Sequence, residues 1–478
     1  MSFSSIQFIF YFLPAFLIFY FLVPRKMKYP VLLGASCLIY LWGSPTGAAL
    51  LIPATVMDYI LGRAIHGAGT RQLKKLLLGI SVTINVLILI YFKYSNFFIG
   101  EVNRLLSFFG AEAIPWTTVI FSVGISFITF HKISYLVDIY YGKVKPADSL
   151  AAYALYLVMF PKIALGPIVL YHDMEEQLSR PRITPEGVFE GGIRFCVGLA
   201  RKVLLADPMG AVADQVFRME FHSITVGFAW LGIVCYSFQL YFDFAGYTDM
   251  AIGIGRMIGI RIPENFNRPF YSRNFTEHWK RWHITLGNFF REYLYIPLGG
   301  NRASKFITYR NLWIVFIVSG LWHGANWTYI VWGIYNGFFM FIDRLFLLKV
   351  LNRLPKFLTI SFFYVGLLVG YVFFRSETIG DAAFYIHRMF DVTAIGAIES
   401  NQLLTQLVGN REWFVIVVSL LICFFPDTLY ERMKSTASTK IPPSGIIALK
   451  TAGATLLFIL SVISIINNSF SPFIYFRF

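Results

Sequence analysis

Apolar stretches close to the length of a membrane span recur along the whole chain, and they constrain the fold more than any other feature. About 20 apolar residues in a helix cross the hydrocarbon core of a bilayer. Of the 478 residues, 57% are hydrophobic and 14% are charged, whereas soluble domains carry about a quarter charged residues. The sequence therefore predicts an all-α, polytopic membrane protein with about 11–12 spanning helices and further re-entrant or amphipathic ones. The expected spans are 8–23, 30–43, 47–62, 76–99, 117–141, 150–171, 188–204, 226–254, two within 311–342, 357–374, 412–426 and 445–466.

The net charge of +15 indicates topology rather than a nucleic-acid partner. In membrane proteins Lys and Arg concentrate in cytoplasmic loops, and no nucleic-acid-binding motif accompanies them here. The first apolar stretch lacks a positive start and a cleavage site, so we expect an uncleaved span. The basic residues Arg25, Lys26 and Lys28 follow it and place the N-terminus outside. Four widely spaced cysteines without CxxC spacing predict neither disulfides nor a metal site.

One expected span carries residues that a straight helix tolerates poorly. The segment 153–171 reads YALYLVMFPKIALGPIVLY, with Pro161, Lys162, Gly166 and Pro167 inside an apolar run. Broken backbone at membrane depth is tolerated where protein or a water-filled cavity surrounds it. We expect a re-entrant or kinked element lining an interior chamber; an ordinary proline-kinked span is the alternative. Polar side chains within two other apolar runs are candidates for structural pairing or substrate contact: His131, Lys132, Asp138, Gln239, Asp243 and Asp249.

The largest basic block covers residues 256–310, with ten Lys or Arg and three acids, and should face the cytoplasm. Within it, Trp279, His283, Leu286 and Phe290 have the spacing of one helix face. This pattern predicts a basic amphipathic helix at the inner membrane surface, with His283 on its apolar side. Taken alone, such a histidine is more often a packing residue than a functional one.

Residues 311–342 contain no Asp, Glu, Lys or Arg. One helix of this length would extend ~48 Å, beyond a ~30 Å hydrocarbon core. The run must tilt or break, and Gly320, Gly324 and Asn326 mark the expected place. His323 lies there, ~18 Å from the start of the run and near mid-membrane. An ionisable group at that depth is a functional candidate, and a desolvated imidazole stays neutral and able to accept a proton. The residues expected along a substrate tunnel are Trp322, Asn326, Trp327, Gln239 and Asp243.

The motifs RWHITL and GLWHGANW in these two regions resemble the membrane-bound O-acyltransferase (MBOAT) superfamily. Within it, the chain is most similar to the bacterial branch that contains the membrane subunit of alginate O-acetylation. The stretches FSSIQFIFYFLPAFLIFYFLVP, QLYFDFAGYTDMAIGIG and FFRSETIGDAAFYI also look like that branch, so the resemblance covers nearly the whole chain. It implies a single domain, a ring of spanning helices with a funnel from each face. The expected parts are N-terminal spans 1–142, a catalytic core 143–344, and C-terminal spans with a tail 345–478.

By motif position, the resemblance implies that His323 is the catalytic histidine and His283 the second functional position. Acyl transfer needs a base, a reactive acyl carbonyl and donors for the oxyanion. We expect His323 to act as the base, and His283 to orient the thioester or to donate a hydrogen bond to the oxyanion. Acetyl-CoA is the expected donor, with an acyl-carrier protein thioester as the alternative, and no metal is expected. Donor-binding candidates are Arg281, Arg291 and Trp282, unless the basic block sets topology alone.

The final residues, FIYFRF, spell F-x-Y-x-x-F, which is similar to the C-terminal motif of the small membrane companion in the D-alanine branch. The resemblance implies that Tyr475 accepts the acetyl group. An extracytoplasmic SGNH-hydrolase-like O-acetyltransferase would then pass it to a polysaccharide, with alginate-like exopolysaccharide ahead of peptidoglycan or cellulose. The alternative for Tyr475 is an interface anchor in the lipid bilayer. For the whole chain, the alternatives are a lipid O-acyltransferase of the same superfamily and a secondary transporter. The implied location is the bacterial inner membrane.

Overall fold

The protein is all-helical in the part of the chain described by the computed structural model, and no strand is present there. The described part is residues 2–474 apart from 120–123, 164, 221–222, 303, 392–403, 406, 427–428, 430, 434, 437–440 and 468–470. The prediction of an all-α membrane protein is confirmed. Among the described helices, five are long and apolar enough to cross a membrane: Gly47–Gly67, Arg71–Phe108, Val226–Met257, Lys356–Arg375 and Pro443–Asn467.

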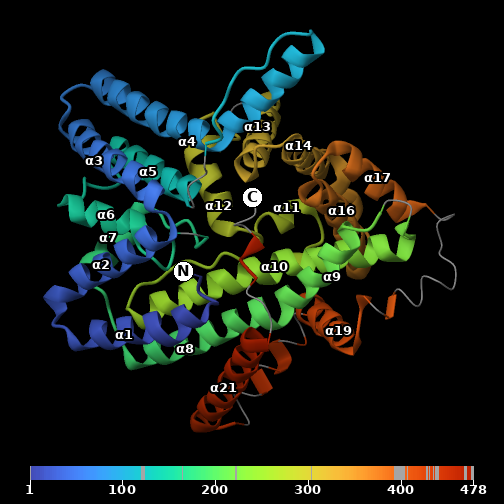
Figure 1. Ribbon diagram of the computed structural model, residues 1–478. Helices are drawn as coiled ribbons and strands as arrows, with labels where there is room; N and C mark the ends of the chain where they lie inside the picture. Colours follow the sequence, from blue (N-terminus) through green and yellow to red (C-terminus); the bar gives the residue numbers. More distant parts are fainter. Residues whose placement is uncertain are drawn as a thin grey trace.

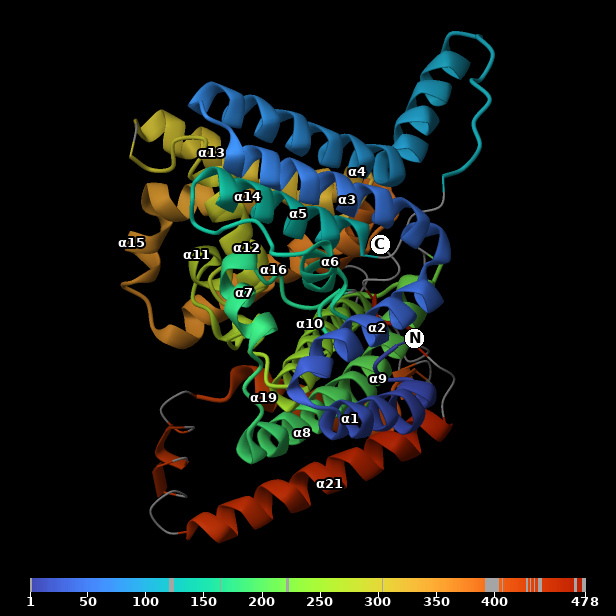
Figure 2. The same cartoon turned by 90° about the vertical axis from the view of Figure 1, so that its left-hand side faces the viewer.

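The N-terminal helices form one side of the molecule (Figure 1). Their bounds are η1 Gln7–Phe12, α1 Leu13–Leu22, α2 Arg25–Gly43, α3 Pro45–Gly67, α4 Arg71–Phe108 and α5 Ile125–Tyr140. The Thr70 hydroxyl accepts the N–H of Leu73 and caps the start of α4, because the first N–H groups of a helix have no partner within it. At 1.5 Å per residue, α4 is about 57 Å long. Its last part projects from the body of the molecule (Figures 1 and 2).

Helix α10 lies at the centre of the molecule (Figure 1), and most of its side chains are buried. The elements leading to it are α6 Leu150–Val158, α7 Tyr171–Ser179, α8 Pro185–Ala200, η2 Arg201–Ala206, α9 Asp207–Phe217 and α10 Val226–Met257. Glycines bring α8 and α10 into backbone contact. A Cβ added to Gly198 would lie 2.6 Å from the carbonyl oxygen of Gly246, and one added to Gly191 would lie 2.6 Å from that of Gly253. Small residues allow this approach between membrane helices.

The segment expected to break in mid-membrane does break. Helix α6 ends at Val158, the described residues from 159 to 170 are not helical, and α7 begins at Tyr171. All of them are buried, including Pro161 and Lys162. The ammonium of Lys162 lies 4.2 Å from the ring centroid of Tyr156, a cation–π contact that partly compensates burial of the charge. The predicted break is therefore confirmed, whereas none of the described residues from 159 to 170 lines the cavities of about 950 and 450 Å³.

The predicted amphipathic helix over 279–290 is wrong. Helix α11 spans Phe275–His278, and α12 starts only at Ile284. His283 lies between them with φ 46° and ψ 51°, in the left-handed region that costs an L-residue about 1–2 kcal/mol. Spacing alone could not reveal this turn, because tertiary packing selects it. α12 Ile284–Phe290 then continues into η5 Arg291–Tyr295.

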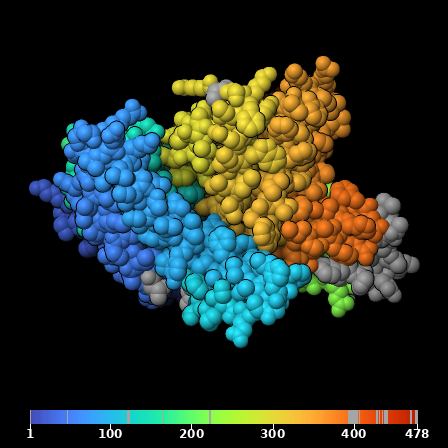
Figure 3. All heavy atoms as spheres, turned by 90° about the horizontal axis from the view of Figure 1, so that it is seen from above, coloured from blue at the N-terminus to red at the C-terminus, as the bar shows by residue number. Residues whose placement is uncertain are grey.

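The apolar run 311–342 folds as two helices with the break where it was expected. Helix α13 spans Lys305–His323 and α14 spans Trp327–Ile342, so the chain turns at Gly324 and Asn326, whereas Gly320 remains helical. The turn lets α14 pack back along α13. On the face shown in Figure 3, atoms of α13 and α14 lie next to those of α4.

The remaining helices close the ring. They are η6 Asp343–Leu347, α15 Leu348–Leu351, α16 Lys356–Arg375, α17 Ile379–Phe390, α19 Asn410–Phe424 and α21 Pro443–Asn467. In Figure 2 the N-terminal segment and the end of α21 lie on one side of the molecule, and α11, α12 and α15 lie toward the other. Helices α11 and α12 of the basic block and the N-terminal segment thus lie toward opposite sides of the molecule (Figure 2).

Candidate active site

His323 is the last residue of α13, and α4 holds the end of that helix. The final carbonyl groups of a helix have no partner within it. Lys93 of α4 donates to the carbonyl oxygen of Trp322 and, at 3.4 Å, to that of His323. The hydroxyl of Tyr94 donates to the carbonyl oxygen of Leu321 at 2.6 Å. Since each uncapped polar group in the membrane costs several kcal/mol, these contacts fix the position of His323.

The imidazole of His323 lies in an aromatic environment and is 7% exposed. Its ring centroid is 4.7 Å from that of Trp322, 4.9 Å from Trp332 and 5.0 Å from Phe374. The three aromatic rings separate the imidazole from bulk water.

The two other tunnel candidates near the turn lie elsewhere. The side chain of Asn326 accepts the N–H of Thr328 and donates to the carbonyl oxygen of Glu377, so it caps α14. Trp327 is 47% exposed and packs against Phe97. Of the expected tunnel residues in this region, the structure brings Trp322 to the histidines.

His283, forty positions earlier in the chain, meets the same tryptophan. Its ring centroid lies 6.0 Å from that of Trp322 and 4.7 Å from that of Phe244 on α10. The residue is 1% exposed. The positive φ at His283 turns its side chain into the interior at the start of α12. Trp322 therefore contacts both candidate histidines.

Asn265 determines which nitrogen of His283 carries the proton. The side-chain oxygen of Asn265 accepts the N–H of Thr285 at 3.1 Å and the Thr285 hydroxyl at 2.9 Å. The Nδ1 atom of His283 lies 3.3 Å from the same oxygen, so Nδ1 is the donor and Nε2 is left as an acceptor. Among the described residues, Nε2 has no hydrogen-bond partner. Burial lowers the pKa of His283 to about 3, so this imidazole is neutral at pH 7.

The non-helical segment 159–170 contacts Thr285, the residue that shares Asn265 with His283. The backbone N–H of Ile168, within the non-helical stretch, donates to the Thr285 hydroxyl at 3.0 Å. The hydroxyl thus accepts from Ile168 while it donates to Asn265. Sequence reasoning did not identify Asn265 or Thr285 as site residues, although Thr285 lies within the motif RWHITL.

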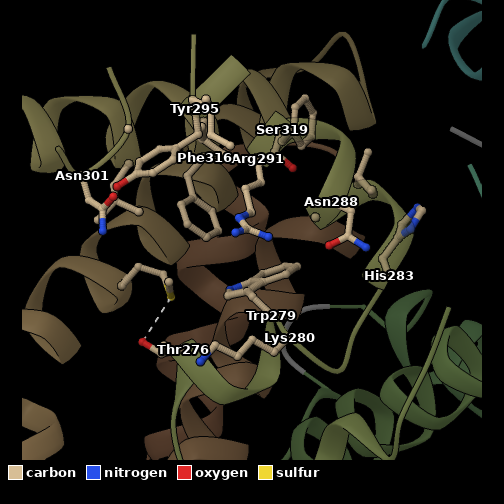
Figure 4. Close-up of a pocket in the computed structure, with 18 of the residues that line it drawn as sticks. Thr276, Trp279, Lys280, His283, Asn288, Arg291, Tyr295, Asn301, Phe316 and Ser319 are labelled. Carbon is tan, nitrogen blue, oxygen red and sulfur yellow. Dashed lines mark hydrogen bonds between the residues drawn. The ribbon is translucent and has the colours of Figure 1, made fainter. Parts of the chain in front are cut away.

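A cavity of about 950 Å³ leads to His283 from the side of the basic block (Figure 4). Its basic lining residues are Lys280, Arg291, Arg302 and Arg344, and its aromatic ones are Trp279, Trp282, Phe290, Tyr295 and Phe316. No Asp or Glu is among its described lining residues. A pocket with cations alone attracts anionic groups such as phosphates.

Two of the three predicted donor-binding residues line this cavity. Arg291 and Trp282 do, whereas Arg281 does not and pairs with Glu277 at 2.7 Å. Sequence reasoning did not name Lys280 and Arg302, although both belong to the basic block that was considered for donor contact as well as for topology. It also missed Arg344, which lies at the far end of the α13–α14 pair and carries no local signal.

Asp243 and Gln239 lie on α10 beside the C-terminal tail. Asp243 pairs with Lys202 at 2.7 Å and accepts the backbone N–H of Ile474 at 2.7 Å. Gln239 lines a second cavity, of about 450 Å³, together with Ser471 of the tail. Phe244, the neighbour of Asp243 on α10, contacts His283, so one helix separates the histidine site from the tail. Tyr475 lies outside the described residues.

Comparison with known proteins agrees with these features. Residues 145–352 match MBOAT, the membrane-bound O-acyltransferase family. The chain is 38% identical to the probable alginate O-acetylase AlgI of Azotobacter vinelandii, covering 100% of both chains. It is 32% identical to the peptidoglycan O-acetyltransferase of Helicobacter pylori, covering 100% of this chain and 97% of that one. The teichoic acid D-alanyltransferase of Bacillus subtilis is 31% identical over 46% of this chain and 58% of its own.

The region matched to the family contains both histidines, the broken segment and the cation-lined cavity. Full-length relatives with acyltransferase names extend the match to the helices on either side. The protein is therefore a multi-pass membrane O-acyltransferase and belongs to the membrane-bound O-acyltransferase family.

Proposed function

We propose that the protein moves an acetyl group from a cytoplasmic thioester across the membrane for O-acetylation of a cell-surface or secreted polysaccharide. An alginate-like exopolysaccharide is the first candidate and peptidoglycan the next, because full-length relatives carry those names. The observation that carries the proposal is the cation-lined cavity that ends at His283, which shares Trp322 with His323. In this proposal the cavity admits a phosphate-bearing donor as far as His283, and Trp322 links that position to His323, the proposed base.

The donor end of the reaction belongs in this cavity. Acetyl-CoA carries several phosphates on a long flexible arm, and Lys280, Arg291, Arg302 and Arg344 offer charge-assisted contacts to them. The arm would extend past Trp279 and Trp282 to place the thioester beside His283. An acyl-carrier protein thioester presents a similar arm with a single phosphate, so the four cations favour the coenzyme.

His283 lines this cavity, and its Nε2 has no hydrogen-bond partner among the described residues, so the residue suits an orienting role. With Nδ1–H engaged by Asn265, the bare Nε2 can accept an N–H from the amide groups of the donor arm. Donation to the oxyanion would require protonation at Nε2, which burial opposes. Of the two roles expected for His283, orientation of the thioester is the one we propose.

His323 is the proposed general base. An acceptor hydroxyl gives its proton to the neutral imidazole as its oxygen attacks the acetyl carbonyl carbon. The C–S bond of the thioester then breaks, and the proton passes from the imidazolium to the departing sulfur, so coenzyme A leaves as a thiol. Positioned bases of this kind contribute roughly 100- to 10,000-fold to rate.

Tyr475 is the proposed first acceptor. A phenol of pKa ~10 is a better leaving group than a sugar alkoxide, so an acetyl-tyrosine would be an activated ester. The two residues before it, Phe473 and Ile474, are 0% and 5% exposed. Because they are buried against protein, they favour the acceptor role over the interface anchor. An extracytoplasmic SGNH-hydrolase-like transferase would take the acetyl group from Tyr475 to the polysaccharide.

The test uses the purified protein and radiolabelled acetyl-CoA. We expect label on the chain at Tyr475, located by peptide mass spectrometry, and none on a Tyr475→Phe variant that still inserts into membranes. In cells, Tyr475→Phe should abolish polymer acetylation. Unchanged polymer acetylation would eliminate the relay, and label in extracted lipid instead of polymer would favour the lipid acyltransferase alternative.

A further inference from the structure

A buried ion network lies beneath the C-terminal tail. The ammonium of Lys202, on η2, is 2.7 Å from an Asp243 oxygen and 2.6 Å from an Asp207 oxygen. The side chains of Lys202 and Asp243 are 2% and 3% exposed, and that of Asp207 is 28% exposed. Two carboxylates thus share one ammonium, which leaves acceptor capacity on Asp243.

The C-terminal tail, residues 471–474, binds Asp243 through the oxygen other than the one paired with Lys202. The backbone N–H of Ile474 donates to the second oxygen of Asp243 at 2.7 Å. Lys202 also donates to the carbonyl oxygen of Pro472 at 3.4 Å, and its ammonium lies 4.9 Å from the ring centroid of Phe473. Both members of the ion pair therefore bind the tail.

Aromatic packing completes the contact. The ring of Phe473 lies edge-on to that of Tyr247 at 5.1 Å, and Tyr247 stacks on Phe3 from the start of the chain. Such pairs contribute about 0.5–1.5 kcal/mol beyond their burial. The ring sits in a socket between α10 and the N-terminal segment.

We infer that the Lys202–Asp243 pair is a binding site for the backbone of the C-terminal tail and holds Ile474 at a set depth beside α10. Without the tail, one Asp243 oxygen would be a buried acceptor with no N–H to bind, and such a loss costs more when the group is charged. Binding of the tail by the pair does not depend on the proposed function, whereas its effect on acetyl transfer does. Because Tyr475 follows Ile474 directly, the pair limits where the acceptor hydroxyl can go, and Lys202 and Asp243 act as positioning residues.

Hydrogen exchange of the full-length protein in detergent, followed by mass spectrometry, tests this binding directly. Removing one charge of a buried pair can unfold a protein, whereas replacing both by apolar residues is often tolerated. The variant is therefore Lys202→Met with Asp243→Leu, and Asp207→Asn is added so that no carboxylate is left without the shared ammonium. We expect the peptide that contains Ile474 to exchange at least about tenfold faster, since a hydrogen bond to a charged group is lost. Peptides from α13 and α21 should exchange at the native rate.

A matched control removes another buried ion pair. Lys132 and Asp58 lie 3.1 Å apart with side chains 4% and 0% exposed, and they pair α5 with α3 instead of binding the tail. Lys132→Met with Asp58→Leu should leave tail exchange at the native rate, and Lys202→Arg should preserve tail protection. Equal tail exchange in the native protein and in the Lys202/Asp243 variant would overturn the inference. So would equally fast tail exchange in the control.

Polymer acetylation, measured on the same variants, separates this inference from the relay. A released tail together with lost acetylation supports both. A released tail with native acetylation supports tail binding by the pair and refutes its role in positioning the acceptor, whereas Tyr475→Phe tests the relay itself. A protected tail in the Lys202/Asp243 variant refutes the binding site, whatever the acetylation level.

Discussion

Replacing Gly320 by Ala tests whether contact between α13 and α14 sets the position of His323. A Cβ on Gly320 would lie 2.4 Å from the carbonyl oxygen of Tyr329 and 3.2 Å from the Cα of Gly333. Both atoms belong to the backbone of α14 and cannot rotate away. Ordinary contact begins at 3.4 Å, so the two helices must separate by about 1 Å at this point.

The displacement reaches the catalytic residue because His323 follows Gly320 by three positions on the same helix face. A misplacement of about 1 Å can reduce the rate about 100-fold. Stability should change less, because overpacking costs roughly 1–3 kcal/mol and Ala recovers about 1 kcal/mol of helix propensity. We therefore expect Gly320→Ala to fold and to retain its KM for acetyl-CoA, while kcat falls about 100-fold.

Turnover of radiolabelled acetyl-CoA by purified protein measures both constants. The control is Gly79→Ala on α4, where an added Cβ meets nothing within 4 Å and activity should be native. If Gly320→Ala stays within about twofold of this control, the position of His323 does not depend on the α13–α14 contact. A rise in KM with native kcat would contradict the reasoning equally.

Substitutions of three further residues test the site, two of them with a control variant. Replacing His323 by Ala should lower acetyl transfer by about 100-fold or more at unchanged acetyl-CoA binding, and native turnover would remove its role as the base. Asn265→Ala removes the acceptor that keeps the proton of His283 on Nδ1 and should lower kcat/KM about tenfold. Asn265→Asp keeps an acceptor and should retain more activity. Equal kcat/KM values for the two variants would contradict the proposed role of Asn265. Arg291→Ala should raise the KM for acetyl-CoA about tenfold at constant kcat. The guanidinium of Arg281 is paired with Glu277, so Arg281→Ala should leave KM unchanged. Similar KM values for the two variants would argue against the cavity as the donor site.

Much of the architecture could be predicted from local sequence. The apolar runs mark most of the helices, because 20 apolar residues have few alternatives to spanning a bilayer. Prolines and glycines mark the two breaks, after Val158 and at Gly324. The charge-free run 311–342 predicted that His323 is buried, and that residue is 7% exposed. The basic block supplied Arg291 and Trp282 as donor-binding candidates, and both line the cavity.

Other features of the site depend on residues far apart in sequence. Helical periodicity assigned His283 to a continuous helix, whereas the structure turns the chain there with a positive φ. Asn265 and Thr285 resemble ordinary polar residues until their side chains meet at His283. No sequence pattern around Lys202 predicts its contact with Pro472 of the tail, which lies 270 positions away.

The sequence by itself determined a helical membrane protein with two buried histidines. The length of each apolar run and the position of a polar residue within that run can be read from the segment alone. Tertiary structure decided that Trp322 contacts both histidines, which nitrogen of His283 is free, and that Asp243 binds Ile474. The physical reason is that buried hydrogen bonds and ion pairs are satisfied between segments, and their partners are selected only when the helices pack.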